Sequence, residues 1–209
     1  MLLTLGVIGA VVAVRWSGEP DYETTPLAID ADALRAGDLV FRRGRSLTSR
    51  MVLAADQRSP YSHVGIVYRG DDGPRILHAI PGEDFDSLMP LQVASPAAFT
   101  EAASAVSIRR LAQDDAGVAE RAAASAWSYT RDAVRFDADF DLQSRDAMYC
   151  TELVWHAYRD AGLDLVDGVF VDLIIPFGEG PYILPSSLLD SPYLTEIFSF
   201  TRKSGNRYD

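Results

Sequence analysis

The chain has one cysteine, Cys150, and three histidines, two of which, His63 and His78, lie in apolar stretches earlier in the sequence. One cysteine excludes an internal disulfide and a zinc site built from several thiolates. A buried structural residue, a surface thiol and a nucleophile remain as interpretations of Cys150. Nucleophilic catalysis by a thiol needs a base and a polar group that orients the base, and the two histidines are residues of the right type.

Cys150 stands at the start of a predicted helix, residues 149–158, which ends before Gly162. On a helical projection the apolar residues share the side of Cys150, and three polar side chains lie opposite: Glu152, His156 and Arg159. Cys150 is therefore expected to face the protein body from the first turn. Free N–H groups and the helix dipole at that position would lower the pKa of the thiol and hold an oxyanion. His156, on the polar side, is assigned no catalytic role.

His63 and His78 belong to two alternating segments, residues 62–68 and 75–80, which are typical of strands. The turn residues between them, Gly70 to Gly73, predict an antiparallel hairpin that brings His78 within hydrogen-bond reach of His63. Gly65 shares a face with His63 and leaves room for another backbone, such as the cysteine helix, to approach. Each histidine alone is more often an ordinary core or surface residue. Their pairing beside a cysteine is what points to catalysis.

The rest of the chain supplies the elements that must position these side chains. Further strands are predicted at residues 38–41, 105–111 and 197–200, and further helices at 46–55 and 116–130. Strands and helices in separate blocks indicate an α+β protein, with an antiparallel sheet packed against helices. The stretches 81–104 and 163–185 are predicted to be irregular and to form the walls of a substrate pocket.

The N-terminal segment differs from the rest. Residues 2–14 are an uninterrupted run of apolar and small residues, shorter than the roughly 20 residues that span a bilayer. The run fits an export signal or a short anchor, although a buried core element is an alternative. We expect residues 1–25 to be a targeting or anchoring segment with a linker, and residues 26–209 to be one catalytic domain. The protein would then be exported or membrane-anchored in the cell envelope, on the periplasmic side if it is bacterial.

The net charge of −11 argues against nucleic acid as a partner, since an acidic protein is not attracted to it. Four arginines nevertheless cluster after the first predicted strand: Arg42, Arg43, Arg45 and Arg50. They form either a solvated face or a contact for an anionic substrate group or a lipid headgroup. Three aspartates, Asp137, Asp139 and Asp141, alternate as in a calcium loop, but the turn glycine and the closing glutamate are missing. A solvated acidic loop beside the cleft is the expected structure.

Three segments together resemble a known family: Asp38-Leu-Val-Phe41, Tyr61-Ser-His-Val-Gly-Ile-Val67 and Tyr149-Cys-Thr-Glu-Leu-Val154. They resemble the YiiX/YebB-like permuted branch of the NlpC/P60 superfamily, and residues 185–192 resemble its closing segment. The resemblance covers about residues 30–200, and the order of histidine before cysteine marks the permutation. It implies a permuted papain-like fold with Cys150 as the nucleophile at a helix N-terminus and His63 as its base.

The third catalytic position falls on the next strand, where relatives often carry glutamate. The matching residue here is His78, which is similar to the lecithin:retinol acyltransferase-like branch, and Glu83 is the alternative. The resemblance implies a cysteine hydrolase, without a cofactor, that cleaves an amide bond in a cell-envelope peptide. A lipid hydrolase or acyltransferase of the same fold and a non-catalytic envelope-binding module are the alternatives. The types of Cys150, His63 and His78 would also suit an open zinc site, a lesser alternative.

Overall fold

The structure is a computed structural model, and it describes residues 25–82, 89–114, 117–142, 144–175 and 178–202. Of the predicted targeting segment, residues 1–25, residues 1–24 lie outside the described residues. Within the described part, no helix is both long enough and apolar enough to cross a bilayer.

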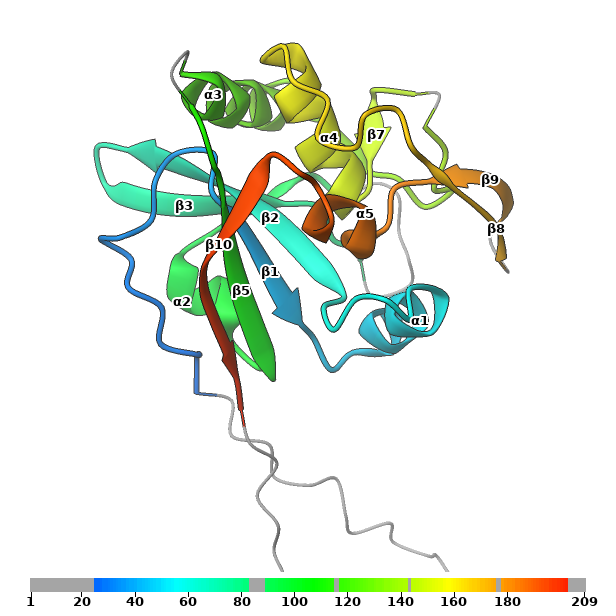
Figure 1. Cartoon of the computed structure of the whole chain (residues 1–209), viewed down its shortest axis with the longest axis horizontal. Helices are drawn as coiled ribbons and strands as arrows, with labels where there is room; N and C mark the ends of the chain where they lie inside the picture. Colours follow the sequence, from blue (N-terminus) through cyan, green and yellow to red (C-terminus); the bar gives the residue numbers. More distant parts are fainter. Residues whose placement is uncertain (1–24, 83–88, 115–116, 143, 176–177, 203–209) are drawn as a thin grey trace, which may run out of the picture.

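The centre of the molecule is a six-stranded sheet in which every pair of neighbours is antiparallel (Figure 1). In spatial order its strands are β10 (Leu194–Thr201), β5 (Ala105–Leu111), β1 (Leu39–Arg43), β2 (His63–Gly70), β3 (Gly73–His78) and β4 (Gln92–Ala94). Two short ribbons complete the strands. They pair β6 (Arg135–Phe136) with β7 (Ala147–Met148), and β8 (Val171–Ile175) with β9 (Gly178–Tyr182).

The helices are α1 (Leu47–Ala55), α2 (Pro96–Thr100), α3 (Val118–Arg131), α4 (Cys150–Asp160) and α5 (Pro185–Leu189). Helices α3 and α4 pack against each other and against β2, whereas α2 contacts β3 and β4. Alternate residues of the strands feed two separate hydrophobic clusters. Ile66 packs in the cluster that contains Leu153 of α4, and Val67 packs in the cluster that contains Phe99 of α2. The period-two alternation of strands thus builds a core on each face of the sheet, and the predicted α+β class is confirmed.

Two expectations about local structure were wrong. The stretches predicted to be irregular contain β4, α2, β8 and β9. Helix α4 has no polar face over its first two turns, because Glu152 and His156 are 0% and 5% exposed. The two side chains are four residues apart and lie 3.4 Å from each other, between Glu152 Oε1 and His156 Nε2. A buried polar pair that is four residues apart looks, in a helical projection, like one solvated face.

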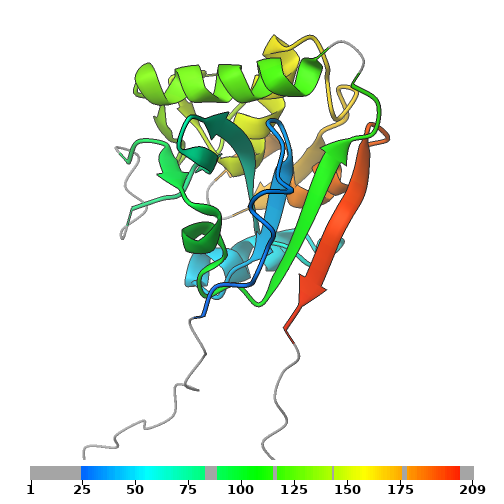
Figure 2. The same ribbon diagram turned by 90° about the vertical axis from the view of Figure 1, so that its left-hand side faces the viewer.

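The first and last residues of the described chain lie beside each other. The guanidinium of Arg202 donates a hydrogen bond of 2.7 Å to the carbonyl of Thr25. This is the end of the sheet where β1 and β10 finish, and α1, which follows β1, lies at the same end (Figures 1 and 2).

Candidate active site

Cys150 is the first residue of α4, after an extended Tyr149. Two hydrogen bonds fix this helix start to Ile183, just before α5. The Ile183 N–H donates to the Tyr149 hydroxyl at 3.0 Å, and the Thr151 hydroxyl donates to the Ile183 carbonyl at 2.6 Å. The carboxyl group of Glu152 accepts the N–H of Tyr149 at 3.2 Å. The predicted placement of Cys150 at a helix N-terminus is therefore what the structure shows, and the neighbours of Cys150 hold it there.

The thiol of Cys150 has backbone N–H donors around it, yet it stays protonated in the free protein. Hydrogen bonds from the N–H groups of Val64, Thr151 and Cys150 itself, and the charge of Arg42, lower its pKa. Burial outweighs them and raises the pKa to about 11. The N–H groups at the helix start lower the pKa of the thiol as expected, but the net shift is upward, because an apolar surrounding penalises the thiolate more than these donors stabilise it. The resting site therefore holds a neutral thiol.

His63 and His78 are joined directly. Nε2 of His63 lies 3.0 Å from Nδ1 of His78, and the side chains are 8% and 5% exposed. The predicted hairpin is present, with Gly70 paired to Gly73. Gly65 makes room for this pair: a β-carbon there would lie 2.5 Å from the side chain of Ile76 and 3.2 Å from Cβ of His78. The space beside Gly65 is thus filled by β3, and not by the cysteine helix as expected.

The histidine pair defines a proton arrangement. Burial, followed by the charge of Arg42, lowers the pKa of His63 well below its ordinary value and that of His78 to about 3. Both rings are therefore neutral at neutral pH, and one of the two facing nitrogens must donate to the other. If Nε2 of His63 donates, its Nδ1 carries a lone pair that can accept a proton from the thiol. Among the described residues no hydrogen bond yet joins the thiol to His63; such bonds often tighten only when substrate binds.

Phe99 and Arg42 surround this pair; no role was expected for Phe99, and Arg42 was expected only in the basic cluster that forms either a solvated face or a contact for an anionic group. The ring of Phe99, 1% exposed, stacks on His63 with centroids 5.6 Å apart and meets His78 edge-on at 5.0 Å. The guanidinium of Arg42 lies 4.8 Å from the centre of the same ring and donates to the Phe99 carbonyl at 2.7 Å. The pairing of β1 with β2 would have indicated a place for Arg42 beside the histidines, because Arg42 is directly opposite His63 in that register. Strand alternation would have placed the two on one face, once that register was known.

An apolar cavity of about 350 Å³ opens beside the thiol, and both Cys150 and His63 line it. Its walls come from α1, from the loop after β6, and from the segment between β8 and α5. The apolar lining residues include Met51, Val52, Phe136, Phe140, Leu173 and Ile183. The predicted wall segment 163–185 does contribute, whereas α1 was not expected to.

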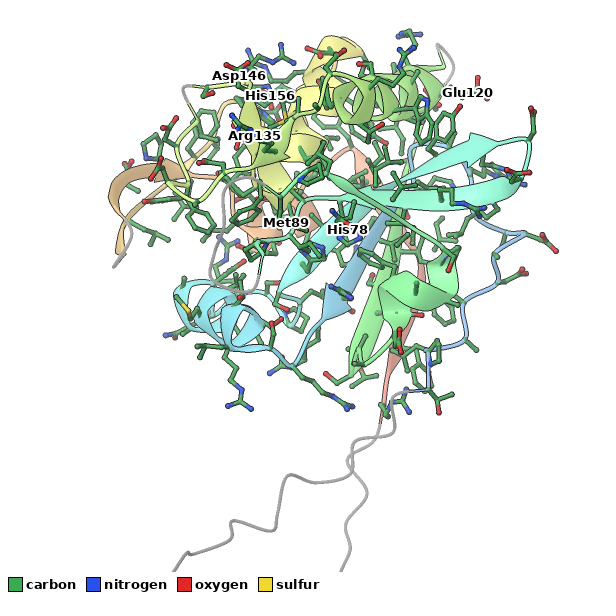
Figure 3. The ribbon with its side chains drawn as sticks, turned by 180° about the vertical axis from the view of Figure 1, so that it is seen from behind. His78, Met89, Glu120, Arg135, Asp146 and His156 are labelled. Atoms are coloured by element: carbon green, nitrogen blue, oxygen red, sulfur yellow. The ribbon has the colours of Figure 1, made fainter. Side chains whose placement is uncertain are left out.

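Other predicted features fall elsewhere. Glu83, the alternative third catalytic residue, lies outside the described residues. His156 lies toward the α3 and α4 end of the molecule, well apart from His78 (Figure 3). The acidic loop is not wholly solvated, because Asp137 is 7% exposed and its carboxylate accepts the N–H groups of Asp139 and Asp141.

The thiol and the two histidines do not form a metal site. In the part of the chain that the structure describes, no three side chains of His, Cys, Asp or Glu are arranged to hold a metal ion. The nitrogens that face each other in the histidine pair are engaged in their mutual hydrogen bond. The donor set present therefore does not fit a zinc ion.

Comparisons with known proteins identify the family and the fold of the chain. A family model described as permuted papain-like amidase enzyme, YaeF/YiiX, C92 family, matches residues 33–198. Among solved structures the chain is similar to the crystal structure of metalloprotein yiiX from Escherichia coli O157:H7. The TM-score is 0.66 at 22% sequence identity, over 80% of this chain and 98% of that chain. At this identity the likeness shows the fold alone. A comparison with curated proteins finds no match.

Proposed function

The chain belongs to the C92 family of permuted papain-like amidases, and on this premise we propose that it cleaves amide bonds with Cys150 as nucleophile, His63 as base and His78 as the residue that orients the base. The observation that carries the proposal is the 3.0 Å bond between the two histidines, one of which lines the same cavity as the only cysteine. A merely structural cysteine would need neither histidine.

The chemistry proceeds in two halves. Nδ1 of His63 takes the proton of the Cys150 thiol while the sulfur attacks the carbonyl carbon, and the Cys150 N–H at the helix start stabilises the oxyanion. The tetrahedral intermediate collapses to a thioester as His63 gives its proton to the leaving amine. A water then attacks the thioester, giving its proton to His63, and the acid and the thiol are released. Because the resting thiol is neutral, proton transfer accompanies attack and does not precede it.

The first candidate substrate is a peptide of the cell envelope, as the motifs imply. A lipid-borne acyl group is the second candidate, because the cavity beside Cys150 is apolar and large enough for part of an acyl chain. In that case the rest of the lipid leaves as an alcohol or amine when the thioester forms, and the acyl group passes to water, giving a fatty acid, or to another acceptor, giving an acylated acceptor. Both candidates accord with export or membrane association through the N-terminal segment, which we likewise propose.

Intact-protein mass spectrometry tests the proposal directly. The protein is mixed with peptidoglycan peptides, with N-acyl amino acids or with phospholipid vesicles, and quenched in acid to trap the thioester. We expect an added mass equal to the acyl group, located on Cys150, and its loss in Cys150→Ala. The added mass identifies which substrate class was cleaved. Neither an adduct nor product from any of the three would favour the non-catalytic binding module and contradict the enzyme.

A further inference from the structure

Helix α1 covers the apolar cavity without being buried itself. Its inner side contributes Thr48, Met51 and Val52 to the cavity wall, yet none of its residues is buried. Leu47, at the N-terminal end of the helix, is 69% exposed, and Arg50, one turn later, is also exposed. The helix therefore presents apolar surface to the cavity and an apolar and basic surface to its surroundings.

Positive charge is concentrated around this helix in an otherwise acidic chain. Residues 42–58 contain five arginines and one acidic residue, Asp56. Asp56 is buried and accepts the Ser186 N–H, and Arg58 is paired with Asp190. Arg43 and Arg50 are exposed and form no ion pair with any described carboxylate. Salt screens the interaction between charges that are more than about 8 Å apart. The positive charge of this face, and not the net charge of the whole chain, therefore decides which charged surfaces it attracts.

The same face adjoins the point where the chain continues toward its N-terminus. The carbonyl of Arg43 accepts the Ser104 N–H at 2.9 Å, and the carbonyl of Ser104 accepts the Arg202 N–H at 2.8 Å. Arg202 in turn holds Thr25. The 24 residues that precede Thr25, with their apolar run at residues 2–14, are therefore attached at the α1 end of the molecule.

We propose that the α1 face, defined by Arg43, Leu47 and Arg50, docks on an anionic lipid bilayer. Arginines beside an exposed leucine fit a surface of acidic headgroups over an acyl region. Docking would place α1, and with it one wall of the cavity, at the surface of the bilayer. The consequence that a lipid-borne carbonyl approaches Cys150 from the membrane rests on the proposed function, whereas the docking does not.

The single cysteine makes a local test possible. In the full chain carrying Cys150→Ala, Leu47→Cys is labelled with bimane, and Val169→Cys, 67% exposed in the parent, serves as the matched control position. On vesicles of phosphatidylcholine with phosphatidylglycerol we expect the emission at position 47 to shift to the blue and to resist iodide quenching. Position 169 should remain as in water. A water-like signal at position 47 would overturn the proposal even if the N-terminal segment binds the vesicles.

A second variant tests the role of charge. Arg43→Glu with Arg50→Glu, in the labelled Leu47→Cys chain, should weaken the vesicle-dependent shift at least about thirtyfold in lipid concentration, because the attraction of two arginines is lost and the two glutamates are repelled by the acidic headgroups in addition. Arg131→Glu with Arg135→Glu makes the same charge change on exposed arginines, and Arg135 lies far from α1 in Figure 3. The proposal would be contradicted if both pairs of substitutions weakened the vesicle-dependent shift equally, or if the emission shifted equally on vesicles of purely neutral lipid. Because every chain in the test lacks the thiol, failure to dock is distinguishable from failure to hydrolyse.

Discussion

Two replacements of His78 distinguish the effect of its hydrogen bond to His63 from the effect of its side-chain volume. Asparagine carries its amide oxygen at about the same distance from the backbone as Nδ1 of histidine, so His78→Asn can keep an acceptor for the Nε2–H of His63. Leucine fills a similar volume and accepts nothing. We expect His78→Asn to retain most of the activity and His78→Leu to lose it.

The size of the loss follows from the burial of the pair. The bond is 3.0 Å long, and both rings are more than nine-tenths buried. A buried donor left without a partner costs about 1–3 kcal/mol. If this penalty falls on the tautomer of His63 that accepts the thiol proton, kcat/KM drops by about 5- to 150-fold, since roughly 1.4 kcal/mol is a factor of ten. For His78→Asn we expect a drop of less than about fivefold, because one neutral hydrogen bond is merely exchanged for another.

Two measurements decide the matter. Release of p-nitrophenolate from activated acyl esters gives kcat and KM for the three proteins. Nitrogen NMR with labelled histidine reports the tautomer, and the chain has only three histidines to assign. The parent protein and His78→Asn should show the proton on Nε2 of His63, and His78→Leu should show a mixture of tautomers. If His78→Leu keeps both its rate and a single Nε2–H tautomer, then His78 does not orient the base.

Three further predictions concern pH. The alkylation rate of Cys150 by iodoacetamide should rise with pH until about 11, because burial raises the pKa of the thiol to about 11; a plateau near pH 8 in the folded protein would contradict this. Burial raises the pKa of Glu152 to about 9 in the folded state, above its unfolded value of 4.5. Between these two pH values the folded state keeps a proton that the unfolded state has lost. The free energy of unfolding therefore falls as the pH rises through this range. Urea unfolding should therefore show Glu152→Gln gaining about 2–3 kcal/mol over the parent protein between pH 6.5 and 8.5, and parallel pH dependences would refute the assignment. The acid limb of the pH profile of kcat/KM should lie below pH 6.5, because burial and the charge of Arg42 lower the pKa of His63. Phe99→Leu uncovers the ring of His63, so in this variant the acid limb should move up toward pH 6.5 and kcat should fall. An acid limb that does not move would mean that Phe99 has only a packing role.

The parts of the site that local sequence determines could be predicted. Alternation and the Gly70 to Gly73 turn are enough to form the hairpin that joins the two histidines. The helix that begins at Cys150 follows from its apolar periodicity and from Gly162, which has a positive φ of 95° at the helix end.

The parts that depend on distant segments could not be predicted. Phe99 reaches the histidines from α2, which interrupts a stretch without strong periodicity, and its position depends on contacts with β3 and β4. The sign of the pKa shift of Cys150 depends on how completely segments distant in sequence bury the thiol. A helix start alone says nothing about that enclosure, so the helix dipole appeared to be the main influence on the pKa.

The attachment of Ile183 to the start of α4 has a consequence for redesign of the protein. Tyr149 and Thr151 hold Ile183 after the hairpin of β8 and β9, and the indole N–H of Trp155 holds the carboxylate of Asp164 before it, so α4 fixes the segment at both ends. Lengthening such a loop costs little, since closure entropy grows only slowly with length. The hairpin carries the cavity residues Leu173 and Tyr182. Residues 171–182 can therefore be exchanged to change the wall of the cavity while Cys150 keeps its place at the start of α4.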